Sequence, residues 1–191
     1  MKFLKPSNQI IVGLLFLSSS LYSAVQIIQP SENAYEEIQE AFILAEPGDV
    51  IRLTSGTYNL QDSLSLDVEG VQVEGEGMGQ TVLNFSNQQS GAQGLSVTSD
   101  NVTLQDFSVQ NAKGDAIKVK GVTNIKFLRV KTEWTNGPSP ENGAYGLYPV
   151  ESTNVLIDGC VAIGASDAGI YVGQSKNIIV RNSRAEFKIG S

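Results

Sequence analysis

The chain contains no histidine, and this absence excludes whole classes of site within its 191 residues. Neither a Ser-His-Asp nor a Cys-His arrangement can be built from these residues, and neither can a zinc or copper site with histidine ligands. A single cysteine, Cys160, excludes an internal disulfide. Basic residues are also scarce, with 13 Lys and Arg against 20 Asp and Glu. The formal charge of −7 argues against nucleic acid or an anionic membrane as the main partner.

The N-terminal segment has the order of an export signal. Lys2 and Lys5 make it positively charged, the apolar run "IIVGLLFL" follows, and "SSSLYSA" ends in small residues. The run is far shorter than the ~20 residues of a membrane-spanning helix. We therefore predict a signal peptide over residues 1–24 and a secreted, periplasmic or cell-surface protein; a buried N-terminal strand is the alternative. Residues 25–191 suffice for one sizeable core but not for a second full domain.

An internal repeat organises the middle and end of the chain. The segments "SDNVTLQDFSVQNA", "GVTNIKFLRVKTE", "ESTNVLIDGCVAIGA" and "QSKNIIVRNSRAEF" align on four asparagines. These are Asn101, Asn124, Asn154 and Asn177. Two of the three intervals between them are equal, and the longer middle interval contains "TEWTNGPSPENG", whose Gly, Pro and Asn content indicates a loop. Repeats at intervals of 23, 30 and 23 residues predict a parallel β-solenoid, in which each coil covers the apolar face of its neighbour.

Apolar residues recur at fixed offsets from each asparagine. The columns that follow it are Val102, Ile125, Val155, Ile178; Leu104, Phe127, Ile157, Val180; and Phe107, Val130, Cys160, Ser183. Those that precede it are Ile117, Leu147, Ile170, and Val119, Pro149, Val172, with Leu95 and Val97 offset by one residue in the first coil. Alternation along a strand places these columns inside the solenoid. We therefore expect Cys160 to be a core residue, and the asparagines to form a stacked hydrogen-bonded ladder.

The segment before the repeats has a different pattern. Ile38, Ala41, Phe42 and Ala45 recur at helical spacing, and "PGD" at residues 47–49 predicts the end of that helix. The alternation in "VIRLTSGTYNL" then predicts a strand. A helix before the first coil would cover the open apolar end of a solenoid, which such folds need for solubility.

These motifs resemble a known superfamily. "IQEAFILAEPGDVIRLTSGTYNL" is similar to the opening of right-handed parallel β-helix proteins of the pectate-lyase-like superfamily, and "GIYVGQSKNIIVRNSRAEF" is similar to their repeats. The resemblance runs from about Val25 to the end of the chain. It implies an all-β, right-handed parallel β-helix with a short N-terminal capping helix. Because "AEFKIGS" stops inside an expected turn, we also predict that the domain is truncated at its C-terminal end.

One strand resembles a more specific family. "YGLYPVES" is similar to the tyrosine–glycine–x–Asp–Pro–His segment of mannuronan C5-epimerases. Tyr148 and Val150 stand where that family has its Asp and His, and Tyr145 matches. Valine can do no proton chemistry, and tyrosine, with an ordinary pKa of about 10, is a poor substitute for a carboxylate. Epimerase activity by that mechanism is therefore not expected, and no catalytic residue is assigned.

The outward side of this strand predicts a binding face. Ser96, Lys118, Tyr148 and Tyr171 form one outward column, with Lys120 beside Val150, and six of the thirteen Lys and Arg lie between residues 113 and 131. Aromatic rings stack on the apolar faces of sugars, and lysines pair with uronate carboxylates. The candidate substrate-binding residues are Lys118, Lys120, Tyr145, Tyr148 and Tyr171. The alternative is a solvated strand face.

Carboxylates suggest no clear metal site. Lyases of this fold class commonly use calcium, which takes six to eight oxygen ligands, so calcium is possible although no cofactor is evident. The closest set in sequence, which strand alternation aims in different directions, is Asp62, Asp67, Glu69, Glu74 and Glu76. Asp158 and Arg181 fit a surface ion pair as well as catalysis, and turn formation explains Asp115 and Asp167. The loop with Glu133, Trp134 and Glu141 is either one wall of a cleft or an insertion between coils.

Two hypotheses about function follow. The first is an exported β-helix protein that binds or processes a polysaccharide, with an anionic polymer as one candidate. If it is an enzyme, a uronate-polymer lyase or hydrolase is favoured over an epimerase. The second is a non-catalytic scaffold or binding protein of the cell envelope or surface. The sequence predicts no membrane span and no nucleic-acid partner, and gives no oligomeric state.

Overall fold

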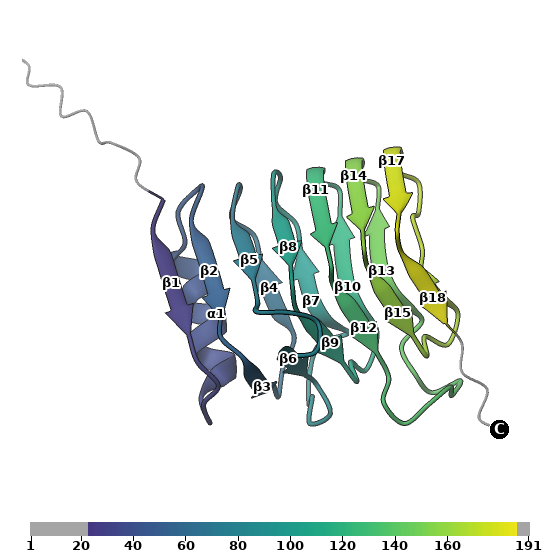
Figure 1. Cartoon of the computed structure of the whole chain (residues 1–191), viewed down its shortest axis with the longest axis horizontal. Helices are drawn as coiled ribbons and strands as arrows, with labels where there is room; N and C mark the ends of the chain where they lie inside the picture. Colours follow the sequence, from purple (N-terminus) through teal and green to yellow (C-terminus); the bar gives the residue numbers. More distant parts are fainter. Residues whose placement is uncertain (1–22, 187–191) are drawn as a thin grey trace, which may run out of the picture.

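The computed structural model describes residues 23–186, so the predicted signal peptide, except Ser23 and Ala24, lies outside the described residues. The chain winds into stacked coils, and corresponding strands of successive coils pair side by side (Figure 1). Every pairing is parallel, as the repeat predicts. No helix within residues 23–186 is long and apolar enough to cross a membrane.

Three sheets form the sides of this parallel β-helix. The first sheet consists of β1 (Val25–Ile28), β2 (Val50–Leu53), β5 (Gln72–Glu74), β8 (Thr103–Gln105), β11 (Thr123–Leu128), β14 (Thr153–Asp158) and β17 (Lys176–Arg181). The second sheet consists of β4 (Leu64–Leu66), β7 (Gln93–Val97), β10 (Asp115–Lys120), β13 (Tyr145–Val150) and β16 (Ala168–Ile170). The third sheet consists of β3 (Gly56–Asn59), β6 (Thr81–Asn84), β9 (Ser108–Gln110), β12 (Lys131–Glu133), β15 (Val161–Ile163) and β18 (Arg184–Glu186). The core consists of the apolar side chains that point into the space between these three sheets.

The strand register confirms the apolar columns, but Val180, in the last described coil, is 47% exposed. In the first sheet Phe127 pairs with Leu104 on one side and Ile157 on the other. In the second sheet Ile117 pairs with both Leu95 and Leu147, so the one-residue offset of the first coil is a shorter turn, as predicted. All six side chains are fully buried. Stacked coils therefore bury one another's apolar faces, which is how a solenoid builds its core.

The predicted asparagine ladder is present. Asn101, Asn124, Asn154 and Asn177 all lie in the left-handed backbone region, with φ between 55° and 60°. Each later asparagine donates its amide to the side-chain oxygen of the one before it, at 2.8, 2.9 and 3.0 Å. Asparagine tolerates this backbone conformation better than most residues. Asparagine therefore serves two purposes at these turns: it adopts the left-handed backbone, and its side chain hydrogen-bonds to the equivalent asparagine of the next coil.

The capping helix is also as predicted. Helix α1 (Ala34–Leu44) buries Ile38, Ala41 and Phe42, and the chain becomes extended at Ala45, just before the predicted stop at Pro47. Figure 1 shows the helix at the N-terminal end of the stack, where it contacts β1, β3 and β4. Its apolar face thus covers the core at that end of the described residues.

The segment after the helix corrects one prediction. "VIRLTSGTYNL" was expected to be a single strand, but it forms β2 and β3, which belong to different sheets. The chain turns a corner at Thr54 and Ser55. Gly56 begins β3 at φ +139°, where a Cβ atom would lie 2.4 Å from the Pro30 ring. Tyr58 then points into the core, and its hydroxyl donates to the carbonyl of Ile28 at 2.8 Å.

Two further side chains belong to the core. Cys160 is fully buried, as predicted, and burial raises the pKa of its thiol, which makes the reactive thiolate less available. Trp134 begins the long loop, but its side chain is only 5% exposed and its indole N–H donates to the carbonyl of Ala112 at 2.8 Å. Trp134 therefore anchors the loop to the body of the solenoid, and together with Glu141 it lines a small hollow beside Ala112.

Candidate functional site

The outer face of the second sheet brings the predicted binding residues together. Along β13 two consecutive residues, Gly146 and Leu147, are buried, which places Tyr145 and Tyr148 on the same outer face although they are three residues apart. A Cβ atom on Gly146 would lie 2.5 Å from the Thr132 Oγ1 atom inside the solenoid. The absence of a side chain at Gly146 therefore allows the strand to come close to the opposite sheet and so shift the alternation.

Three tyrosines form a compact group, here called the tyrosine cluster: Tyr145, Tyr148 and Tyr171. The ring centroids of Tyr145 and Tyr171 are 4.8 Å apart and stacked, with 23° between the planes. Tyr148 lies 4.6 Å from Tyr145 and 5.4 Å from Tyr171. These separations are in the range of favourable aromatic pairs. Tyr171 remains 43% exposed, so the cluster presents an aromatic surface to solvent.

Lysines border the cluster on the side of the preceding coil. Lys118 pairs in register with Tyr148 and with Ser96, as predicted, and its Nζ atom lies 5.1 Å from the centroid of the Tyr148 ring. At this distance the ammonium group is attracted by the ring. Lys120 is exposed at the end of β10 and pairs in register with Val150. Both lysines therefore lie on the predicted face.

The burial of Val150 differs from the prediction. Alternation places it on the outer face next to Lys120, but its side chain is only 6% exposed. The neighbouring residue in the next coil is Gly173, which has no side chain. The vacant position above Gly173 is lined by Val150, Tyr148 and Tyr171, each within 3.4 Å of where a Cβ atom would lie. Val150 is thus packed beside the tyrosine rings and is not available to solvent.

Two carboxylates that the sequence analysis assigned to turns lie at this face. Asp115 is the first residue of β10, not a turn residue, and its side chain is 13% exposed. Its Oδ2 atom lies 3.9 Å from the Nζ atom of Lys118. Burial raises the pKa of Asp115, although the Lys118 charge and a hydrogen bond from the Tyr145 backbone N–H oppose the shift. Asp167 lies in the turn before β16, and its hydrogen bond with the Tyr145 hydroxyl raises the pKa of that phenol.

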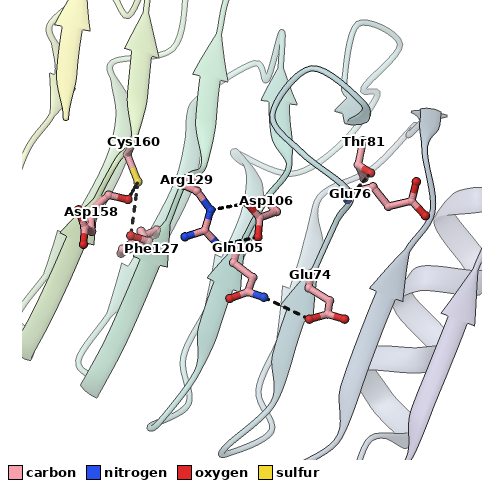
Figure 2. Close-up of polar contacts among 9 residues, drawn as sticks. All are labelled: Glu74, Glu76, Thr81, Gln105, Asp106, Phe127, Arg129, Asp158 and Cys160. Atoms are coloured by element: carbon pink, nitrogen blue, oxygen red, sulfur yellow. Dashed lines mark hydrogen bonds and ion pairs between the residues drawn. The ribbon is translucent and has the colours of Figure 1, made fainter. Parts of the chain in front are cut away.

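The other candidate carboxylates are engaged elsewhere. Asp158 pairs with Arg181 at 2.8 Å and accepts a hydrogen bond from Asn182, and these contacts hold the pKa of Asp158 below its usual value. Asp106 binds Arg129 through both of its oxygens, at 2.6 and 2.7 Å (Figure 2). Both ion pairs join successive coils. The prediction that Asp158 and Arg181 form a surface ion pair is therefore confirmed.

The acidic residues near the N-terminal coils are also dispersed. Each carboxylate has its own partner: Asp62 with Ser90, Asp67 with Thr98, Glu69 with Asn101, Glu74 with Arg52 and Gln105, and Glu76 with Ser55. Figure 2 shows Glu74 accepting from the Gln105 amide, and Glu76 contacting Thr81 through its backbone N–H. Within residues 23–186 no three Asp, Glu or Cys side chains are grouped as metal ligands would be. Calcium binding therefore stays a prediction without assigned residues.

Comparison with known proteins identifies the fold. A family model described as "Right handed beta helix region" matches residues 69–188. No curated protein matches the sequence. A solved pectin methylesterase mutant in complex with a hexasaccharide is 13% identical, with a TM-score of 0.53 over 86% of this chain and 58% of the other. A second pectin methylesterase–hexasaccharide complex is 11% identical, with a TM-score of 0.40 over 76% of this chain and 54% of the other.

At such low identity the likeness to the first of these structures shows the fold alone. This chain spans 58% of the length of that protein. These matches give no support to the resemblance to mannuronan C5-epimerases. The family match covers more than half of the residues, and the sheets, the register and the helix agree with it. The chain therefore belongs to the right-handed β-helix family, and its fold is the all-β, right-handed parallel β-helix with a short helix at its N-terminal end.

Proposed function

We propose that this protein binds a polysaccharide across the outer face of the second sheet. The observation that carries the proposal is the tyrosine cluster, three rings with centroids within 5.4 Å of one another beside the Lys118 ammonium group. Sugar rings have apolar faces that stack on aromatic side chains, and their hydroxyl groups hydrogen-bond to nearby polar groups. The cluster offers aromatic faces, while Asp115, Lys118 and Lys120 supply polar contacts around it.

The polymer that this face suits best is an anionic one in an extracellular or periplasmic setting. Two lysines lie beside the rings and offer ammonium groups to an anionic ligand, while Asp115 and Asp167 lie at the same face. A uronate would place its ring on the tyrosines and its carboxylate near Lys118. The solved pectin methylesterase of the same fold holds a hexasaccharide, which supports a sugar ligand by analogy. Export by a signal peptide over residues 1–24 is part of this proposal.

A second candidate function is cleavage of the bound polymer by elimination or hydrolysis. Asp115 favours it, because its raised pKa lets the carboxyl keep a proton at a higher pH than usual, as a general acid requires. A non-catalytic scaffold at the cell envelope or surface is the alternative.

The binding test compares variants on two faces of the solenoid. We would titrate the purified protein with oligogalacturonate, oligomannuronate and a neutral oligosaccharide of equal length. Tyr148→Ala and Tyr171→Ala should each weaken binding by roughly twofold to tenfold, since one aromatic contact contributes about 0.5–1.5 kcal/mol. Ile179→Ala is the control, because Ile179 is 56% exposed on the first sheet in the same coil as Tyr171. Absence of binding to all three ligands, or an equal loss in Ile179→Ala, would contradict the proposal.

Cleavage is tested on the same mixtures. Elimination gives an unsaturated product that absorbs in the ultraviolet, whereas hydrolysis gives new reducing ends without that absorbance. Either product, lost in Asp115→Asn, would establish an enzyme with Asp115 in its site. Binding without any product, with and without added calcium, would favour the scaffold.

A further inference from the structure

The Asp115–Lys118 pair has an unusual setting for an ion pair on an exposed sheet. The side chain of Asp115 is 13% exposed and that of Lys118 is 29% exposed, so both are partly withdrawn from water. The 3.9 Å between Oδ2 and Nζ exceeds the roughly 2.7–2.9 Å of a charge-assisted hydrogen bond. Lys118 also lies beside the Tyr148 ring. The ammonium group is therefore held near Asp115 without being saturated by it.

We propose that this pair is a proton-coupled subsite for a uronate carboxylate: the ligand carboxylate takes Lys118 as its partner, and Asp115 takes up a proton in the exchange. The inference rests on the proposed polysaccharide function and deepens it by naming the ligand group and its pH dependence. It assigns Asp115 the role of a specificity residue, because its charge competes with that of the ligand. No bond of the ligand is broken, and the proton comes from solvent.

The physical reason is like-charge repulsion in a partly buried place. A ligand carboxylate within reach of Lys118 would lie close to Asp115, and two neighbouring carboxylates cannot both remain ionised without a large penalty. Burial already raises the pKa of Asp115 in the free protein. The second negative charge raises this pKa further, so protonation of Asp115 accompanies binding. Linkage then requires affinity to change with pH.

The groups around Asp115 leave it as the site of proton uptake. Lys118 faces it from the same strand, and the Tyr145 backbone N–H donates to it from β13. Gln93 lies in register with it on β7 and carries no charge. Burial and the charge of Asp115 raise the pKa of Tyr148, so that phenol stays neutral near pH 7. Lys120 and Glu151 lie further along the same edge of the face. Asp167 is hydrogen-bonded to the hydroxyl of Tyr145.

The competition between Asp115 and the ligand for Lys118 fixes the direction in which uronate affinity changes with pH. Uronate affinity rises as the pH falls from about 7 towards 5, because protonated Asp115 no longer competes for Lys118. One proton per site limits the change to about tenfold per pH unit. A neutral oligosaccharide brings no charge to Lys118, so its affinity stays level over the same range.

The test measures proton uptake by calorimetry on the whole protein. Titrations with oligogalacturonate at pH 6, in two buffers of different ionisation enthalpy, give the protons bound per site. We expect a fraction of one proton for oligogalacturonate and none for a neutral oligosaccharide of equal length. Asp115→Asn should abolish the uptake, tighten uronate binding at pH 7 and make it independent of pH. Asp67→Asn is the matched control, since Asp67 follows β4 on the same sheet, two coils away.

Every result decides between the two proposals. Uronate binding without proton uptake, or uptake that persists in Asp115→Asn, overturns the subsite and leaves polysaccharide binding intact. Binding of the neutral ligand alone does the same. Absence of binding to either ligand overturns both. The comparison of the two ligands uses the unaltered protein, so it holds even if Asp115→Asn fails to fold.

Discussion

A single hydroxyl group inside the solenoid provides a sharp test of the core. Thr132 lies in the middle of β12, fully buried, and among residues 23–186 its Oγ1 atom has no hydrogen-bond partner. The residues in register on either side are Val109 and Ala162, so its surroundings are apolar. A buried hydroxyl without a partner costs about 1–3 kcal/mol of folding free energy. Replacing it with a methyl group of similar size should therefore stabilise the protein.

We expect Thr132→Val to raise the free energy of unfolding by about 1–2 kcal/mol, since it removes the unpaired group and buries one more methyl. The preceding coil already carries Val109 at the equivalent position, which shows that valine suits this site. For a protein of this size the melting temperature should rise by about 2–8 °C. Thermal unfolding followed by circular dichroism, together with urea titration, measures both quantities.

Thr81 supplies a control of opposite sign. It is equally buried in the same sheet, but its hydroxyl accepts the Glu76 backbone N–H at 3.0 Å and lies within 3.3 Å of the carbonyls of Leu53 and Thr54. Thr81→Val should therefore destabilise the protein by about 1–3 kcal/mol. If Thr132→Val lowered the melting temperature, or if both variants moved it in the same direction, the reasoning from unpaired hydroxyls would be refuted.

Two further predictions concern contacts between coils. Asn154→Ala removes two ladder hydrogen bonds and forces alanine to φ 57°, so it should cost about 2–4 kcal/mol in urea unfolding; Asn154→Gly, which suits that backbone, should cost less. Asp158 has a lowered pKa, so the stability it provides is complete above the ordinary Asp pKa and is lost as the pH falls through the lower folded value. Asp158→Asn should therefore flatten the decline in melting temperature between about pH 5 and pH 2; an unchanged decline would contradict this.

The fold could be predicted from the sequence because its repeated positions are set by local chemistry. Asparagine marks a left-handed turn, and the apolar residues that follow it must face inward, so one aligned column fixes the register of its neighbours. The corner at Thr54 was missed because apolar residues alternate both before and after it, although the buried positions change phase there, from Ile51 and Leu53 to Tyr58 and Leu60. Alternation describes which side of a strand a residue occupies, but it does not say when the chain changes sheet.

The site was predicted in outline and missed in detail for a similar reason. Tyr148, Tyr171 and Lys118 could be placed by counting along each strand. The burial of Val150 depends on Gly173 in the next coil, and the position of Asp115 depends on two consecutive inward residues, Ala116 and Ile117. Both effects come from the approach of neighbouring backbones, which strand alternation alone does not describe.

The side-chain amide dipoles of the asparagine ladder all point in the same direction. Every amide in it donates towards the N-terminal coil, and the first, Asn101, donates to a carboxylate oxygen of Glu69 at 2.7 Å. An ionised carboxylate can only accept, so the opposite orientation would set the Asn101 oxygen against the Glu69 charge. Aligned amides reinforce one another, and the carboxylate stands at their positive end, as an acid does at the start of a helix. One acidic side chain, in the turn before β5, thus orients four amide dipoles, the furthest of them in the last described coil.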